Sequence, residues 1–126
     1  TRIKQNSVAV PAKPRVTFSH SPLHGRGVFA LRTFKPGEEI EACHAVLIPW
    51  GQVEPDSVLS AYVFDWDDDS AAFVLGCGSL YNHSDEPAAH VVMDYDEQTA
   101  HFMASRHIKG GEEITIDYGD DYPKSW

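Results

Sequence analysis

The side chains best suited to chemistry lie in three short segments of this sequence. They are Gly25-Arg26-Gly27, Tyr81-Asn82-His83-Ser84 and Ile116-Asp117-Tyr118-Gly119. Glycine lets the backbone approach a ligand closely, and an amide such as that of Asn82 both donates and accepts hydrogen bonds. Each segment also has a plain structural interpretation: a β-turn for the glycines, an Asx-turn for Asn82, and a core tyrosine at a strand end for Tyr118.

The elements that must position these segments are mostly short strands. Alternating apolar residues and β-branched or aromatic side chains between turn residues predict strands. The expected strands are Val16–Ser19, Gly27–Leu31, Glu39–Ile48, Tyr62–Phe64, Ala72–Leu75, Ala89–Asp94, Ala100–Ser105 and Glu113–Ile116. Helical turns are expected only over Asp56–Ala61, with Asp56 as a cap, and over Gly78–Asn82. The sequence therefore predicts a mostly β domain over residues 15–126, preceded by a flexible arm over residues 1–14.

Two segments of the chain resemble each other. Arg32–Ile40 and Ser105–Ile114 share a basic residue, an apolar residue, a lysine and the run Gly-Glu-Glu-Ile. Both precede an expected strand. They are either two similar turn-to-strand units or a chance match.

Composition narrows the class of partner. The chain has 126 residues with a net charge of −9, from 10 basic and 19 acidic residues. Nucleic-acid binding needs basic surface, so direct contact with nucleic acid is not expected. A basic protein or peptide suits this charge, although acidity also serves solubility. No apolar run is long enough to span a membrane and no signal peptide is expected, which favours an intracellular, cytoplasmic or nuclear location.

Neither a metal site nor a disulfide framework is expected, while the sequence leaves a single disulfide between Cys43 and Cys77 open. Cys43 and Cys77 are too few for a disulfide framework or a cysteine-built zinc cluster, and most often such residues are buried free thiols. The acidic run that begins at Asp65 lacks the glycine and glutamate of a calcium loop, since Ser70 and Gly76 occupy those positions. The seven histidines form no short-spaced zinc pair.

Taken together, the three segments resemble the SET-domain protein lysine methyltransferases across Val16 to Tyr122. The chain is most similar to compact viral and bacterial members without zinc-binding flanks. This resemblance implies a fold of small curved sheets with short helices and a knot-like crossing near the C-terminus. It also implies S-adenosylmethionine as the cofactor and lysine in a protein as the substrate.

The resemblance assigns the cofactor to specific residues. The backbone from His24 through Gly25, Arg26, Gly27 and Val28 would lie against the methionine part of S-adenosylmethionine. The side chain of Asn82 and the backbone of His83 would bind its amino-acid and adenine parts, and Tyr118 would lie beside the methyl group.

The resemblance also implies a lysine channel. Tyr118 and Tyr62 would be catalytic and would line it, although packing alone explains a tyrosine at position 62. A narrow aromatic channel desolvates the target ammonium, which must lose its proton before it attacks. Ile116 would border the channel and leave room for more than one methyl group. Tyr122 or Trp126 would close it as a lid, unless the tail is frayed.

One motif departs from the family pattern. Asp85-Glu86-Pro87-Ala88 replaces the frequent Cys-x-Pro-Asn and keeps only the proline. The expected function is methyl transfer to lysine in a basic protein, such as a histone or histone-like protein, by an enzyme that can form a homodimer. The alternatives are a domain that binds S-adenosylmethionine or a peptide without turnover, and a β-rich module whose turns mimic the motifs.

Overall fold

The structure is a computed structural model that describes residues 13–119. Within that range the fold is mostly β, as predicted, and no helix is long and apolar enough to cross a membrane. The predicted arm over residues 1–14 lies almost entirely outside the described residues, as do Tyr122 and Trp126.

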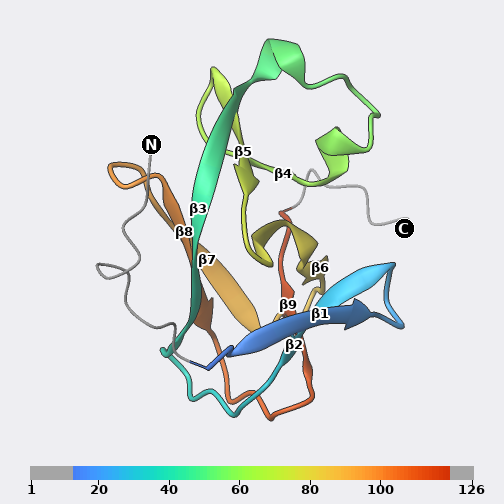
Figure 1. The fold of residues 1–126 in the computed structure, drawn as a ribbon, viewed down its shortest axis with the longest axis vertical. Helices are drawn as coiled ribbons and strands as arrows, with labels where there is room; N and C mark the ends of the chain where they lie inside the picture. The colour runs from blue at the N-terminus through green and yellow to red at the C-terminus, as the bar shows by residue number, and fades with distance from the viewer. Residues whose placement is uncertain (1–12, 120–126) are drawn as a thin grey trace, which may run out of the picture.

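Two sheets make up the domain (Figure 1). The five-stranded sheet has the order β4-β5-β3-β8-β7 and is antiparallel throughout. Its strands are β3 (Glu39–Pro49), β4 (Val63–Asp65), β5 (Ser70–Val74), β7 (Ala89–Asp94) and β8 (Thr99–Ala104). A bulge interrupts the β3–β8 register between Glu39 and Glu41. Strands β4 and β7 are therefore the edges of this sheet.

The four-stranded sheet has the order β1-β2-β9-β6. Its strands are β1 (Val16–His20), β2 (Arg26–Ala30), β6 (Asn82–His83) and β9 (Glu113–Ile116). Strand β9 pairs antiparallel with β2 and parallel with β6, so the last strand is inserted between two earlier ones. The insertion brings the segments around Gly27, Asn82 and Tyr118 to one place in the molecule.

Three short 3-10 helices complete the described chain: η2 (Trp50–Gln52), η3 (Leu59–Ala61) and η4 (Gly78–Leu80). The predicted cap at Asp56 is wrong, because Asp56 has a positive φ of 63° and η3 begins after Val58 without a side-chain cap. Tyr62 was predicted within a strand but lies at the end of η3, directly before β4. Asn82 belongs to β6 rather than to the preceding helical turn.

The two similar sequence segments pair with each other. Phe34 and Ile108 form an isolated antiparallel bridge, with each backbone N–H donating to the other's carbonyl at 2.9 Å. In each turn a glutamate side chain accepts the N–H of the lysine, at 2.8 Å for Glu38 and 3.1 Å for Glu112. The two segments therefore form similar turns that pair with each other.

The core lies between the sheets and these turns. Its largest fully buried side chains are Tyr81, Phe34, Phe102, Ile40, Ile108, Ile114, Ile116, Val28 and Val74. Both cysteines are free thiols; Cys43 is buried as predicted, whereas Cys77 is only half-buried. Burial raises the pKa of the Cys77 thiol to about 11 and the charge of Glu41 adds to this, so Cys77 stays protonated at neutral pH.

Candidate active site

Asn82 binds the turn between β1 and β2 through its side chain. Its side chain is buried, and its amide nitrogen Nδ2 donates to the carbonyl oxygens of His24 at 3.0 Å and Arg26 at 3.1 Å. The same nitrogen lies 2.9 Å from Oε2 of Glu113. The amide donors of Asn82 are thus directed to protein acceptors. A ligand would meet its carbonyl oxygen or its backbone.

Glu113 and Gly27 pack together beside the same turn. Glu113 accepts a hydrogen bond from the Ser21 hydroxyl at 2.7 Å, so one carboxylate ties β9 to both β1 and β6. A Cβ on Gly27 would lie 2.3 Å from Oε2 of Glu113, which explains why this position lacks a side chain. Gly25 differs, since it has a positive φ of 47° and a Cβ added there would meet nothing within 4 Å. The turn is packed on one side and open on the other.

His83 fixes the backbone of Tyr118. The N–H of Tyr118 donates to Nδ1 of His83 at 3.0 Å, which requires an unprotonated Nδ1. The proton of the neutral ring is then on Nε2, which donates to Oδ1 of Asp85 at 2.9 Å. Asp117 lies 3.6 Å from Nδ1. Asp85 therefore selects the tautomer that binds Tyr118.

The hydroxyl of Tyr118, like its backbone, has a fixed partner. It donates to the backbone carbonyl of Tyr81, whose ring is buried and stacked on Phe102 with centroids 4.2 Å apart. The Tyr81 hydroxyl donates to Oε1 of Glu41 at 2.7 Å. Burial, reinforced by Glu41, raises the pKa of Tyr81 well above its usual range, so this phenol stays neutral. Tyr118 is thus held at backbone and hydroxyl by two rigid partners.

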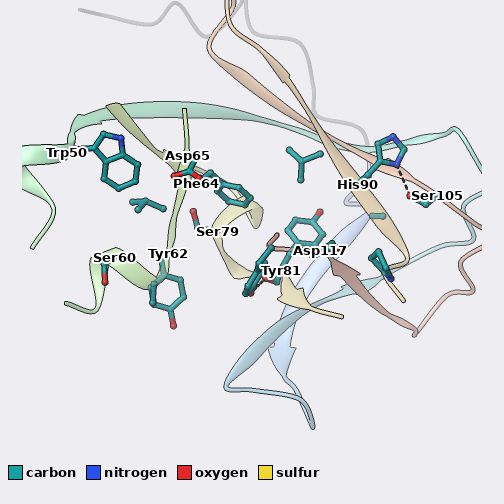
Figure 2. Close-up of a pocket in the computed structure, with 16 residues that line it drawn as sticks. Trp50, Ser60, Tyr62, Phe64, Asp65, Ser79, Tyr81, His90, Ser105 and Asp117 are labelled. Atoms are coloured by element: carbon teal, nitrogen blue, oxygen red, sulfur yellow. Dashed lines mark hydrogen bonds between the residues drawn. The ribbon is translucent and has the colours of Figure 1, made fainter. Parts of the chain in front are cut away.

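A pocket of about 600 Å³ opens beside Tyr118 and includes Tyr62 and Tyr81 (Figure 2). The lining is aromatic and polar, with two carboxylates, Asp65 and Asp117, and no lysine or arginine from the described part of the chain. The side chain of Tyr62 is 38% exposed, so core packing alone does not explain a tyrosine at this position. The pocket can accept an extended cationic ligand and present it to the Tyr118 hydroxyl.

The structure brings most predicted site residues together. The cofactor residues from His24 to Arg26, with Asn82 and His83, cluster around the β1–β2 turn, and Tyr118 connects that cluster to the pocket. Val28 has a fully buried side chain, so only its backbone is available. Ile116 is a core residue and does not line the pocket.

Several residues that contribute to the site were assigned no role in it from the sequence. Tyr81, Glu113 and Asp85 support the motif residues, while Trp50 and Asp65 line the pocket. Tyr81 and Asp85 flank the Asn-His-Ser motif, and Glu113 begins the strand that leads to Tyr118, so proximity in sequence could have suggested these three. Trp50 and Asp65 carry no such indication. Among residues 13–119 no cluster of side chains could hold a metal ion.

Comparison with known proteins gives a consistent result. The SET domain family model matches residues 25–119. A histone-lysine N-methyltransferase of Schizosaccharomyces pombe, specific for lysine-37 of histone H3, is 30% identical over 116 residues, which cover 84% of this chain and 79% of that protein. An N-lysine methyltransferase of Xenopus laevis is 30% identical over 112 residues, which cover 76% of this chain and 33% of that protein. The chain thus spans about a third of the second relative.

A solved structure is similar across nearly its whole length. A Plasmodium falciparum protein assigned as a histone methyltransferase superposes with a TM-score of 0.74 at 30% sequence identity. The match covers 88% of this chain and 98% of that one. The predicted fold of small curved sheets with short helices is confirmed.

Proposed function

This chain belongs to the SET domain family, and from that premise we propose that it is a protein-lysine N-methyltransferase. It transfers a methyl group from S-adenosylmethionine to the side-chain amine of a lysine in a basic protein. The observation that carries this proposal is the position of Tyr118. Its backbone N–H donates to His83, which belongs to the cluster around the β1–β2 turn. Its hydroxyl donates to the backbone carbonyl of Tyr81 at the wall of the pocket.

The pocket suits the deprotonation that the target amine needs. A lysine ammonium has a reference pKa of about 10.4, so a neutral amine is scarce in water at pH 7. Aromatic walls from Tyr62, Phe64 and Tyr81 exclude water from a bound side chain, which lowers its pKa. Tyr118 and Tyr62 then orient the amine, chiefly a proximity effect. The Tyr118 hydroxyl donates its hydrogen to Tyr81, and an oxygen that donates in this way can still accept C–H···O contacts.

The residues of the β1–β2 turn fit S-adenosylmethionine. When bound, this molecule supplies an electrophilic methyl group on a positively charged sulfonium. Gly25 exposes backbone with open space around it, while Asn82 braces the turn from the opposite side. His24 to Gly27, the carbonyl oxygen of Asn82 and the backbone of His83 would hold the cofactor. No metal is needed in this arrangement.

The substrate is a basic protein segment, with a histone or histone-like protein as the leading candidate. Net charge −9 and a pocket whose described charges are all acidic support it. The free edge of β4 lies at the pocket and offers main-chain pairing to an extended peptide. We also predict an intracellular location, cytoplasmic or nuclear, and a homodimer.

Transfer of labelled methyl from S-adenosylmethionine to a panel of histones and other basic proteins tests this function. We expect label on lysine with the wild-type protein and at least about a hundredfold lower turnover with Tyr118→Phe, since misplacing the reacting groups costs that much. Tyr95→Phe is the matched control, because Tyr95 is 60% exposed and does not line the pocket. Cofactor binding without transfer to any substrate would instead indicate a binding domain without turnover.

A further inference from the structure

The pocket is larger than a single target lysine requires. Cavities of about 300 to 1,000 Å³ hold whole drug-sized ligands, and this one measures about 600 Å³. Figure 2 shows Tyr81 near the middle, Trp50, Tyr62 and Asp65 toward one end, and His90 toward the other. Space therefore remains on both sides of the point where the Tyr118 hydroxyl meets the Tyr81 carbonyl. An extended substrate would fill it with residues that flank the target lysine.

The two ends differ in charge. At one end, Nδ1 of His90 and the Ser105 hydroxyl lie 2.7 Å apart, so each satisfies the other. At the opposite end, Asp65 is exposed, and its carboxylate has no ion pair or side-chain hydrogen bond with any residue in the range 13–119. A carboxylate that has no partner among the described residues is available for a cation brought by a ligand.

The local strand directs Asp65 into the pocket. Neighbouring residues of a strand point to opposite faces. Trp66 is 7% exposed and packs on Tyr95, with ring centroids 4.7 Å apart, so Asp65 points the other way. Trp50 borders the same end of the pocket, and its indole N–H donates to the carbonyl of Asp67 at 3.1 Å, which fixes the ring. A carboxylate, the exposed ring of Tyr62 and the half-buried ring of Trp50 thus share one end.

We infer that the Trp50–Tyr62–Asp65 end of the pocket is a subsite for a second basic side chain of the substrate, separate from the lysine that is methylated. This inference rests on the proposed function. The carboxylate pairs with the cation, and an aromatic face stacks beneath it. In an extended peptide, alternate residues lie about 7 Å apart and point to the same side. The second basic residue therefore stands two or four positions from the target lysine.

The acidic turn beyond Asp65 does not carry this role. Asp67 is engaged in closing the turn, since its Oδ1 accepts the N–H groups of Asp69 at 2.9 Å and Ser70 at 2.7 Å. Asp68 is exposed but does not line the pocket. A substitution of Asp68 thus removes the same charge from the turn next to Asp65 without touching the subsite, and it is a matched control.

Peptides with one lysine in a neutral background, each with a single arginine at position −4, −2, +2 or +4, test this inference. Affinity is measured by fluorescence anisotropy, and kcat/KM by methyl transfer, for the wild type, Asp65→Asn and Asp68→Asn. We expect arginine at one position to improve both quantities roughly five- to tenfold, from an exposed ion pair and a cation–π contact. Asp65→Asn loses that gain and Asp68→Asn keeps it.

Two results would overturn the subsite: equal affinity for all peptides, or an equal loss in both variants, which would indicate general charge attraction. The binding measurement separates the two proposals. If the arginine preference and its loss in Asp65→Asn appear without methyl transfer, the subsite stands and the proposed function fails. If transfer occurs with no arginine preference, the function stands and the subsite fails.

Discussion

His83 contributes to the site through its side chain as well as its backbone. Nδ1 accepts the Tyr118 N–H and Nε2 donates to Asp85, so the neutral ring satisfies both neighbours at once. A protonated ring would carry hydrogen on both nitrogens and could not accept from Tyr118. The side chain is 11% exposed, so water would replace the lost acceptor poorly. Placement of Tyr118 therefore depends on one nitrogen of His83.

His83→Phe keeps an aromatic ring but removes this acceptor. We expect kcat to fall about tenfold or more, because an unpaired backbone N–H costs about 1–3 kcal/mol and Tyr118 would shift to satisfy it. His83→Asn, whose carbonyl oxygen can replace Nδ1, should recover much of the loss. Steady-state kinetics with saturating peptide and cofactor measure the effect. Wild-type kcat in the Phe variant, or no recovery in the Asn variant, would contradict this role.

At the scale of elements, three strands converge on one carboxylate. Glu113 of β9 accepts hydrogen bonds from Ser21, next to β1, and from Asn82 of β6, and it lies directly over Gly27 of β2. The first motif is therefore conformationally coupled to the last strand. The turn that contains Ile108 is bonded to β2 as well, since Ala30 exchanges backbone hydrogen bonds with Gly111 and Glu112.

Gly27→Ala tests the close approach of β2 to Glu113. The new Cβ would displace the carboxylate from its hydrogen bonds, and we expect the free energy of unfolding to fall by about 1.5–3 kcal/mol, the usual value of a charged hydrogen bond. Gly51→Ala is the control, since nothing lies within 4 Å of the added atom. Urea unfolding measures both. Equal stability of the two variants would show that Glu113 adjusts freely.

The paired turns give stability a pH dependence. A side-chain hydrogen bond from Arg106 is the main cause that lowers the pKa of Glu112 from 4.5 in the folded state. A lowered carboxylate pKa stabilises the fold above the unfolded value and loses this effect as pH falls through the folded value. Glu112→Gln should therefore cost roughly 0.5–1 kcal/mol at pH 7 and progressively less below pH 4.5.

Thermal unfolding from pH 7 to pH 3 measures that difference. Glu38→Gln is the corresponding change in the other turn, where the backbone N–H of Lys35 is the main cause of the lowered pKa of Glu38. It should follow the same direction with a smaller difference, because Glu38 is more exposed than Glu112. A gap between wild type and Glu112→Gln that stays constant with pH would exclude the ion pair as its source.

At the scale of the whole molecule, charge governs encounter with substrate. The chain carries a net charge of −9, and two of its carboxylates, Asp65 and Asp117, line the pocket. Long-range attraction of this kind raises the association rate of a basic ligand and is screened by salt, whereas the chemistry inside the pocket is screened much less. Salt should therefore act on capture rather than on turnover.

We expect kcat/KM for a basic peptide to fall roughly tenfold between 50 and 500 mM NaCl, as the Debye length shortens from about 14 to 4 Å, with kcat nearly unchanged. A peptide with a neutral background is the control and should lose much less. An equal loss for both peptides, or a loss confined to kcat, would show that salt acts on the fold or the chemistry instead.

The sequence by itself determined the strands, the reaction class and the motif residues. Strand alternation and turn residues are local properties, so most strands of the structure match the prediction within one or two residues. The motifs are equally local, because Asn82 and His83 adjoin each other and Tyr118 ends a strand. Some predictions of short-range detail were wrong, such as the helix cap at Asp56.

Only the tertiary structure decided which of these residues meet. The insertion of β9 between β2 and β6 brings Tyr118 into contact with His83. It also brings Asn82 into contact with the β1–β2 turn. No local pattern specifies that order of strands. The same is true of Trp50 and Asp65, which come together at the pocket because β3 and β4 both pair with β5. Contacts between distant residues depend on how the whole chain closes its core, and that is a property of packing rather than of sequence neighbours.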